Sequence, residues 1–294
     1  MAGNPHQGHG HHGHGGQMTP EQQKQMIEQE IKLSKNLGQI KYKIAVMSGK
    51  GGVGKSTVAA NLAETFQKLG FKTGILDADI HGPNIPRMLG VDGEDLFINE
   101  NRNMVPVETP SGLKVISMAF MIESIDTPII WRGPQKSGSI KQLIAEVEWG
   151  PLDVLIIDNP PGTGDEPLTV LQTIPDIDAV VMVTTPNVVS QEDVLKCVKM
   201  VNMMNVENIG LIENMAYYIC PHCGEKLNIF GEGDGEAFSE EMEINYFGDL
   251  PLTEKVSDSP NRDGVVSTLD PDGEVSKRFV DIVHGIEDEF FKKE

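Results

Sequence analysis

The sequence predicts an α/β fold in which a mostly parallel sheet is flanked by helices on both faces. Three observations lead to this prediction. Six short runs are almost continuously apolar, which is typical of strands buried on both faces, and helical segments lie among them, as in βαβ architectures. A third is a glycine-rich loop between the first run and the helix after it. The predicted strands are residues 43–48, 72–77, 113–118, 153–158, 179–185 and 209–214.

The elements outside these strands follow from local signals. Residues 1–17 form a tail rich in Gly and His that cannot build a core, so we expect disorder, with weak binding of Ni²⁺, Zn²⁺ or Cu²⁺ left open. Residues 18–38 are predicted to be helical, because Pro20 suits a first helical position. Residues 94–108 read as a hairpin inserted between sheet elements. The final segment is predicted to be a helix on the sheet, with Phe279, Ile282, Val283, Ile286 and Phe290 at helical spacing.

Composition argues against several classes of function. The 294 residues carry 44 acidic and 24 basic side chains, a formal charge of −20, whereas a nucleic-acid partner requires a clustered basic surface. No apolar run approaches the roughly 20 residues that span a bilayer, and the N-terminus lacks the features of a signal peptide. Three cysteines cannot form a disulfide framework. We therefore expect a cytoplasmic protein with neither nucleic acid nor membrane as its partner.

Residues 48–57, SGKGGVGKST, contain the strongest motif. Gly49, four residues and then Gly54-Lys55-Ser56 satisfy the phosphate-loop pattern between a strand and a helix. The glycines let backbone N–H groups surround phosphate oxygens, and the helix N-terminus adds its positive end. Lys55 is expected to reach the β- and γ-phosphates and Ser56 to ligate Mg²⁺. The predicted nucleotide-binding residues here are Gly49, Lys50, Gly51, Gly52, Val53, Gly54, Lys55, Ser56 and Thr57.

Lys50 is a second lysine that an ordinary phosphate loop does not require. From its place in the loop it could reach the phosphates of a nucleotide held by another subunit, as an arginine finger does in trans. This interpretation predicts a homodimer.

Acidic residues follow two of the predicted strands. Asp158 ends the run VLIID, where a carboxylate would hold Mg²⁺, through water. Asp77 and Asp79 follow another strand, and one of the two is expected to orient or deprotonate the attacking water. All three carboxylates are therefore predicted to lie beside the phosphate loop.

Residues 217–224, YYICPHCG, raise a question about ligands. The spacing of Cys220 and Cys223 is that of half a zinc ribbon, half an iron–sulfur site or a redox dithiol, and a thiolate site needs about four ligands. Cys197 shares a helical face with apolar residues and is predicted to be a buried core residue. A second copy of the chain, already indicated by Lys50, would supply the two other thiolates.

Seven segments together resemble a known family. In order they are KGGVGKST, DADIHGPNIP, WRGP, LIIDNPPGTGDE, TTPNVVSQEDVLK, IENM and CPHCG. They are similar to the Mrp/Nbp-type (ApbC-like) nucleotide-binding iron–sulfur cluster carriers, which are deviant-Walker-A P-loop ATPases. The resemblance implies an ATP-hydrolysing homodimer that binds Mg²⁺ and a [4Fe–4S] cluster between its subunits and transfers the cluster to apo-proteins. Residues 39–294 would form the ATPase domain, with a CxxC insertion near residues 217–235.

The resemblance also implies residue roles. Lys50 would be the signature lysine, Lys55 the Walker lysine and Asp79 the water-positioning residue, and these three form the implied catalytic set. Asp158 would be the Walker-B aspartate, Asn214 the adenine contact, and Cys220 and Cys223 the cluster ligands. The chain departs from eukaryotic relatives in having no cysteine before Cys197, which puts a second, N-terminal cluster in doubt.

Two alternatives share the ATP site. A positioning or partition-type ATPase would act on DNA or a membrane and would need a basic face, which the sequence does not show. A structural zinc at Cys220 and Cys223 stays open, because zinc and iron–sulfur centres accept the same thiolates.

Overall fold

The computed structural model describes residues 19–80, 82–121, 133–220, 222–231, 233–254, 256 and 264–291. At its centre lies an eight-stranded sheet with the order β12-β9-β8-β1-β7-β2-β6-β5. β5 runs antiparallel to β6, and the remaining pairings are parallel. The strands are β1 (Ile40–Met47), β2 (Thr73–Asp77), β5 (Val107–Glu108), β6 (Lys114–Ser117), β7 (Leu152–Asp158), β8 (Ala179–Thr184), β9 (Ile209–Glu213) and β12 (Asn245–Asp249).

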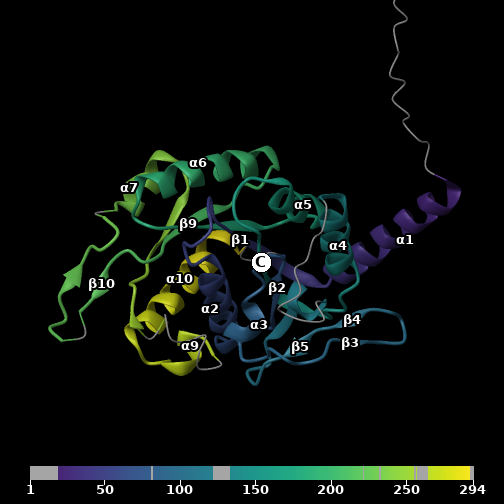
Figure 1. Cartoon of the computed structure of the whole chain (residues 1–294), viewed down its shortest axis with the longest axis horizontal. Helices are drawn as coiled ribbons and strands as arrows, with labels where there is room; N and C mark the ends of the chain where they lie inside the picture. The colour runs from purple at the N-terminus through teal and green to yellow at the C-terminus, as the bar shows by residue number, and fades with distance from the viewer. Residues whose placement is uncertain are drawn as a thin grey trace, which may run out of the picture.

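Helices cover both faces of this sheet (Figure 1), which confirms the predicted fold class. One hydrophobic core contains residues of α2, α9 and α10, and the other contains residues of α1, α4, α5 and α6. Alternate residues of β1 enter the two cores, because side chains alternate across a strand. The helices are α1 (Pro20–Leu37), α2 (Lys55–Lys68), α3 (Ile85–Met88), α4 (Gly133–Ala145), α5 (Asp165–Thr173), α6 (Val188–Met203), α7 (Gly235–Glu241), α9 (Val266–Leu269) and α10 (Glu274–Phe290), with a 3₁₀ turn, η1 (Met118–Met121).

The C-terminal helix α10 buries the apolar residues that the sequence placed on one face, from Phe279 to Phe290. It lies against α2 and the edge strand β12. Burying a large apolar side chain is worth about 1.5–3 kcal/mol, so this face fixes the helix firmly. The predicted position on the sheet is therefore confirmed at the sheet's edge.

The edge strand β12 was not predicted. Its residues 245–249 are only half-buried, and its register with β9 shifts between Tyr246 and Gly248. A half-covered edge strand does not need an apolar run, so the criterion that found the six inner strands could not detect it.

Two short hairpins leave the sheet. β3 (Phe97–Ile98) pairs with β4 (Met104–Val105) in antiparallel fashion, as predicted for residues 94–108. β10 (Tyr218–Ile219) pairs with β11 (Lys226–Leu227) and carries the cysteine motif. The tail of residues 1–17 lies outside the described residues. Within the described part of the chain, no helix has the length and apolarity to cross a membrane.

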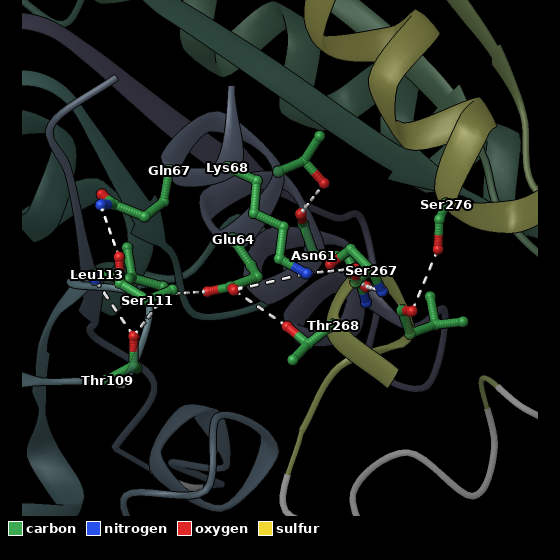
Figure 2. Close-up of polar contacts among 12 residues, drawn as sticks. Asn61, Glu64, Gln67, Lys68, Thr109, Ser111, Leu113, Ser267, Thr268 and Ser276 are labelled. Atoms are coloured by element: carbon green, nitrogen blue, oxygen red, sulfur yellow. Dashed lines mark hydrogen bonds and ion pairs between the residues drawn. The ribbon is translucent and has the colours of Figure 1, made fainter. Parts of the chain in front are cut away.

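The helix that follows the phosphate loop, α2, is fixed on its flank by a buried polar network (Figure 2). Glu64 is 3% exposed and accepts hydrogen bonds from Ser111 Oγ at 2.8 Å and Thr268 Oγ1 at 3.0 Å. Asn61 Oδ1 accepts from both the N–H and the hydroxyl of Ser267 at 3.1 Å. The network joins α2 to the β5–β6 turn and to α9. The helix that follows the phosphate loop is therefore held by hydrogen bonds to two other parts of the fold.

Candidate nucleotide site and cysteine hairpin

The phosphate loop connects β1 to α2, and its shape depends on glycine. Gly52 and Gly54 have φ of 83° and 81°, a region that L side chains rarely adopt. A Cβ on Gly54 would lie 2.2 Å from Asn214 Nδ2, and one on Gly49 would lie 2.4 Å from the carbonyl carbon of Asp193. The loop is therefore packed directly against α6 and against the residue that follows β9.

Asn214 supports the loop from below. Its Nδ2 donates to the carbonyl of Val53 at 2.8 Å, and its own N–H donates to the carbonyl of Thr184 at 2.8 Å. The residue is 6% exposed and lies one position beyond β9, which ends at Glu213. In this structure Asn214 holds the phosphate loop; its contact with adenine stays a prediction.

Lys55 and Asp158 form a buried ion pair behind the loop. Lys55 Nζ lies 2.5 Å from Asp158 Oδ1 and 3.3 Å from Ser56 Oγ, and both charged side chains are at most 6% exposed. Burial raises the pKa of Asp158, and the Lys55 ammonium opposes that rise. The second carboxylate oxygen, Oδ2, is buried and has no hydrogen-bond partner among the described residues.

These groups fit a magnesium ion. Mg²⁺ prefers oxygen ligands and keeps several of its waters. The Ser56 hydroxyl and the unpartnered Oδ2 of Asp158 are oxygen atoms of the kind that would hold such an ion. The structure thus brings together the two residues that the sequence predicted for this ion.

A pocket of about 260 Å³ opens over the loop. Its walls are the phosphate loop with Lys50 and residues of two neighbouring loops, among them Asp79, Asn84 and Pro161. Asp79 lines this pocket whereas Asp77, which is 0% exposed, does not. Of the two candidates for handling the attacking water, the geometry therefore favours Asp79.

Lys50 lies in the wall of the same pocket and is half-buried. Among the described residues, its ammonium has neither an ion-pair nor a hydrogen-bond partner. A lysine at the pocket wall without a partner among the described residues is consistent with a charge directed at another molecule.

The cysteine motif occupies the turn of the β10–β11 hairpin, which projects from one end of the molecule (Figure 1). The Cys220 N–H donates to the Glu225 carbonyl at 3.0 Å, and the Gly224 N–H donates to the Cys220 carbonyl at 2.8 Å. Backbone N–H groups of Cys223 and His222 donate to the Cys220 sulfur and lower the pKa of its thiol. Cys220 is half-buried and Cys223 exposed, so the hairpin presents both cysteines at the surface.

The described residues of one chain do not complete a metal site at the hairpin. The described residues contain no group of three or more His, Cys, Asp or Glu side chains that could hold a metal ion. Cys197 lies on α6, fully buried, as the sequence predicted. Its Sγ is 3.8 Å from the Ser48 carbonyl and 3.6 Å from the Gly162 carbonyl, and burial raises its pKa to about 11.

Two features of the site were not predicted. Gly49 packs against the α6 backbone at Asp193, and the thiol of Cys197 lies directly beneath the phosphate loop. Both contacts join residues more than a hundred positions apart, and no local pattern signals such a contact. The signal available was the glycine itself, which marks a close approach of backbones.

Comparisons with known proteins identify the family of this chain. The family described as NUBPL iron-transfer P-loop NTPases matches residues 39–287. Iron–sulfur cluster carrier proteins of Methanococcus maripaludis and Methanocaldococcus jannaschii are 49% and 45% identical, covering 84% and 91% of this chain and 85% and 91% of their own lengths. A cytosolic Fe–S cluster assembly factor NUBP2 homolog of Dictyostelium discoideum is 45% identical over 75% of this chain and 84% of its own length.

Solved structures are similar as well. A nucleotide-binding protein from Archaeoglobus fulgidus, in complex with ADP, is 37% identical with a TM-score of 0.71, covering 80% of this chain and 92% of that one. MinD of Aquifex aeolicus, at 22% identity and a TM-score of 0.61 over 86% of this chain and 99% of its own, shares the fold. The chain is a P-loop ATPase and belongs to the NUBPL iron-transfer family, which includes the iron–sulfur cluster carriers.

Proposed function

We propose that this ATPase works as a homodimer that carries a [4Fe–4S] cluster between its two subunits and transfers it to apo-proteins. The observation that carries the proposal is the pair of Cys220, which is half-buried, and Cys223, which is exposed, two thiols in a chain whose described residues hold no larger metal-binding group. A thiolate-bound cluster takes about four cysteines. In a two-fold dimer each subunit offers the same surface to the other, so two hairpins would supply four.

The nucleotide half of the mechanism uses residues already in place. Loop N–H groups and the α2 N-terminus bind the phosphates. Lys55 exchanges Asp158 for β- and γ-phosphate oxygens, and the partner subunit's Lys50 adds a second positive charge against the charge that develops in the transition state. Ser56 and Asp158 hold Mg²⁺, which neutralises phosphate charge when bound. Asp79 orients the water that attacks the γ-phosphate in line with the leaving oxygen.

The cargo half depends on accessibility. A cluster at Cys220 and Cys223 lies at the surface, so a client's cysteine thiolates can replace the carrier's thiolates one bond at a time. The lowered pKa of the Cys220 thiol favours its thiolate form, which is the form that binds metal. Exposed free thiols need a reducing compartment; together with the cytosolic Dictyostelium relative, this leads us to propose a cytoplasmic location.

Metal analysis of anaerobically purified protein tests the proposal. We expect about four iron and four sulfide per dimer, with broad thiolate-to-iron absorption, and loss of both in the Cys220→Ser, Cys223→Ser variant. Cys197→Ala is the matched control and should retain the cluster, because the Cys197 side chain on α6 is fully buried. Zinc in place of iron, at about one per dimer, would establish a structural metal site. Full iron loading in the double variant would contradict the assignment of these cysteines.

A further inference from the structure

We propose that Asp77 is a positioning residue that holds the Asp79 carboxylate in the nucleotide pocket by fixing both ends of the loop that contains it. The loop runs from Asp79 to Ile85. This inference rests on the proposed function, because it assigns Asp77 an effect through Asp79. Asp77 itself is the last residue of β2, is 0% exposed and lies outside the lining of the pocket.

The contacts of the Asp77 carboxylate define this role. Oδ1 accepts the N–H of Asp79 at 3.2 Å, and Oδ2 accepts the N–H of Ile85 at 3.3 Å. One carboxylate thus joins two backbone positions at opposite ends of the loop. Oδ2 also accepts the hydroxyl of Ser117 at 2.9 Å, and Ser117 Oγ in turn accepts the N–H of Ala119. The carboxylate is therefore itself held from the neighbouring strand β6.

The surroundings of Asp77 make an acidic residue costly there. The register of β2 and β7 pairs Asp77 with Asp158, a second buried carboxylate. Burial, and then the charge of Asp158, raise the pKa of Asp77 to about 8. An apolar residue would avoid this cost. What the carboxylate adds is the set of three accepted hydrogen bonds, two of which come from the loop.

The loop it holds reaches the nucleotide pocket at two places. Asp79 and Asn84 both line the pocket. The N–H of Asp79 is one of the two amides bound by Asp77, and Asn84 directly precedes Ile85, whose N–H is the other. Loss of either anchor would let Asp79 move relative to the phosphate loop, whereas the nucleotide's own contacts, on α2 and its preceding loop, would stay intact. A positioning role therefore predicts an effect on turnover without an effect on nucleotide binding.

A set of four variants tests the inference through steady-state ATP hydrolysis. Asp77→Asn keeps the shape but replaces one of the two acceptor oxygens, so kcat should fall about tenfold, the equivalent of one lost hydrogen bond, with KM within about twofold. Ser117→Ala removes the third donor, leaves both loop contacts and should keep kcat within about twofold. The kcat of Asp79→Asn should fall further. The double variant Asp77→Asn, Asp79→Asn should be no slower than Asp79→Asn alone, because the effects of residues that act through one another are not additive.

Hydrogen exchange gives a second readout that does not depend on turnover. In Asp77→Asn, at least one of the amides of Asp79 and Ile85, the one that loses its acceptor oxygen, should exchange faster, while the amides of the phosphate loop keep their rates. Full additivity in the double variant, unchanged exchange at these amides, or a rise in KM at constant kcat would each overturn the positioning role. If Asp79→Asn hydrolyses ATP at the normal rate, the role proposed for Asp79 fails first and that of Asp77 falls with it. If Asp79→Asn hydrolyses ATP slowly but the effects of Asp77→Asn and Asp79→Asn on kcat are additive, only the role inferred for Asp77 is overturned.

Discussion

The phosphate loop and the cysteine hairpin differ in how firmly the rest of the fold holds them. The loop is packed on α6 and on Asn214. Lys55, at its end, is buried in an ion pair with Asp158 of β7. The hairpin is a two-strand projection with one half-buried and one exposed thiol. A site that must bind and release the same small molecule many times is best held rigid. A site that must pass its cargo to another protein has to be open.

The two regions are also close along the chain. Five residues separate Asn214, which holds the loop at Val53, from Cys220 in the hairpin. Movement of the loop's support is thus connected to the base of the hairpin through a short, continuous segment. The comparison predicts that changes at the loop alter catalysis and stability strongly, and that changes at the hairpin alter cargo and leave the fold intact.

The largest effect is expected when the two lysines of the loop are separated between subunits. Lys50→Ala and Lys55→Met should each lower ATP hydrolysis by about 10³-fold. An equimolar mixture should recover up to about a quarter of normal activity, because half of the dimers are mixed and each of these has one complete site. The measurement is the rate of ATP hydrolysis after subunit exchange. The free energy of unfolding of Lys50→Ala should lie within about 0.5 kcal/mol of that of the parent protein.

The matched control replaces the rescuing subunit. Lys50→Ala mixed with the Lys50→Ala, Lys55→Met double variant leaves no lysine at position 50 in either subunit, so no activity should return. Absence of recovery in the first mixture would show that Lys50 serves its own subunit's nucleotide, and the dimer proposal would lose its nucleotide-site support.

The next effect concerns the buried pair of Lys55 and Asp158. Lys55→Met leaves the Asp158 carboxylate buried without its partner, which should lower the free energy of unfolding by about 3–5 kcal/mol. Adding Asp158→Asn removes the stranded charge and should restore most of that loss, although the protein stays inactive. Urea unfolding without nucleotide measures this cycle.

A hairpin variant supplies the comparison for that cycle. Cys220→Ser and Cys223→Ser should change the unfolding free energy by less than about 0.5 kcal/mol each in metal-free protein, since both lie in an exposed turn. Additive losses at Lys55 and Asp158, or large losses at the cysteines, would contradict the contrast between a preorganised and an open site.

What the sequence could predict follows the range of each signal. The phosphate loop, the inner strands and the α10 face were accessible because each is a pattern within one short segment. Asp77 was only one of two candidates, because its role depends on Ser117, forty positions away, and on the amide of Ile85. The half-buried strand β12 lacked an apolar run.

The smallest expected effect is on thiol reactivity, and it tests the hairpin geometry directly. In metal-free protein that keeps Cys220 as its only cysteine, the rate of alkylation should rise with pH through a midpoint below the value of about 8.5 for a free thiol. The backbone N–H groups of Cys223 and His222 stabilise the thiolate and cause this shift. Because nucleophilicity falls as the pKa falls, the gain in rate at pH 7 should be only a few-fold.

Cys197 is the internal contrast for this measurement. As the only cysteine it should resist alkylation in the folded protein well above pH 9, because burial raises its pKa to about 11 and its Sγ lies beneath the phosphate loop. Reagent access should therefore require unfolding. A Cys220 midpoint at or above that of a free thiol would mean that the turn does not direct its N–H groups at the sulfur. The proposed cluster would then bind a turn that does not favour the thiolate form of Cys220.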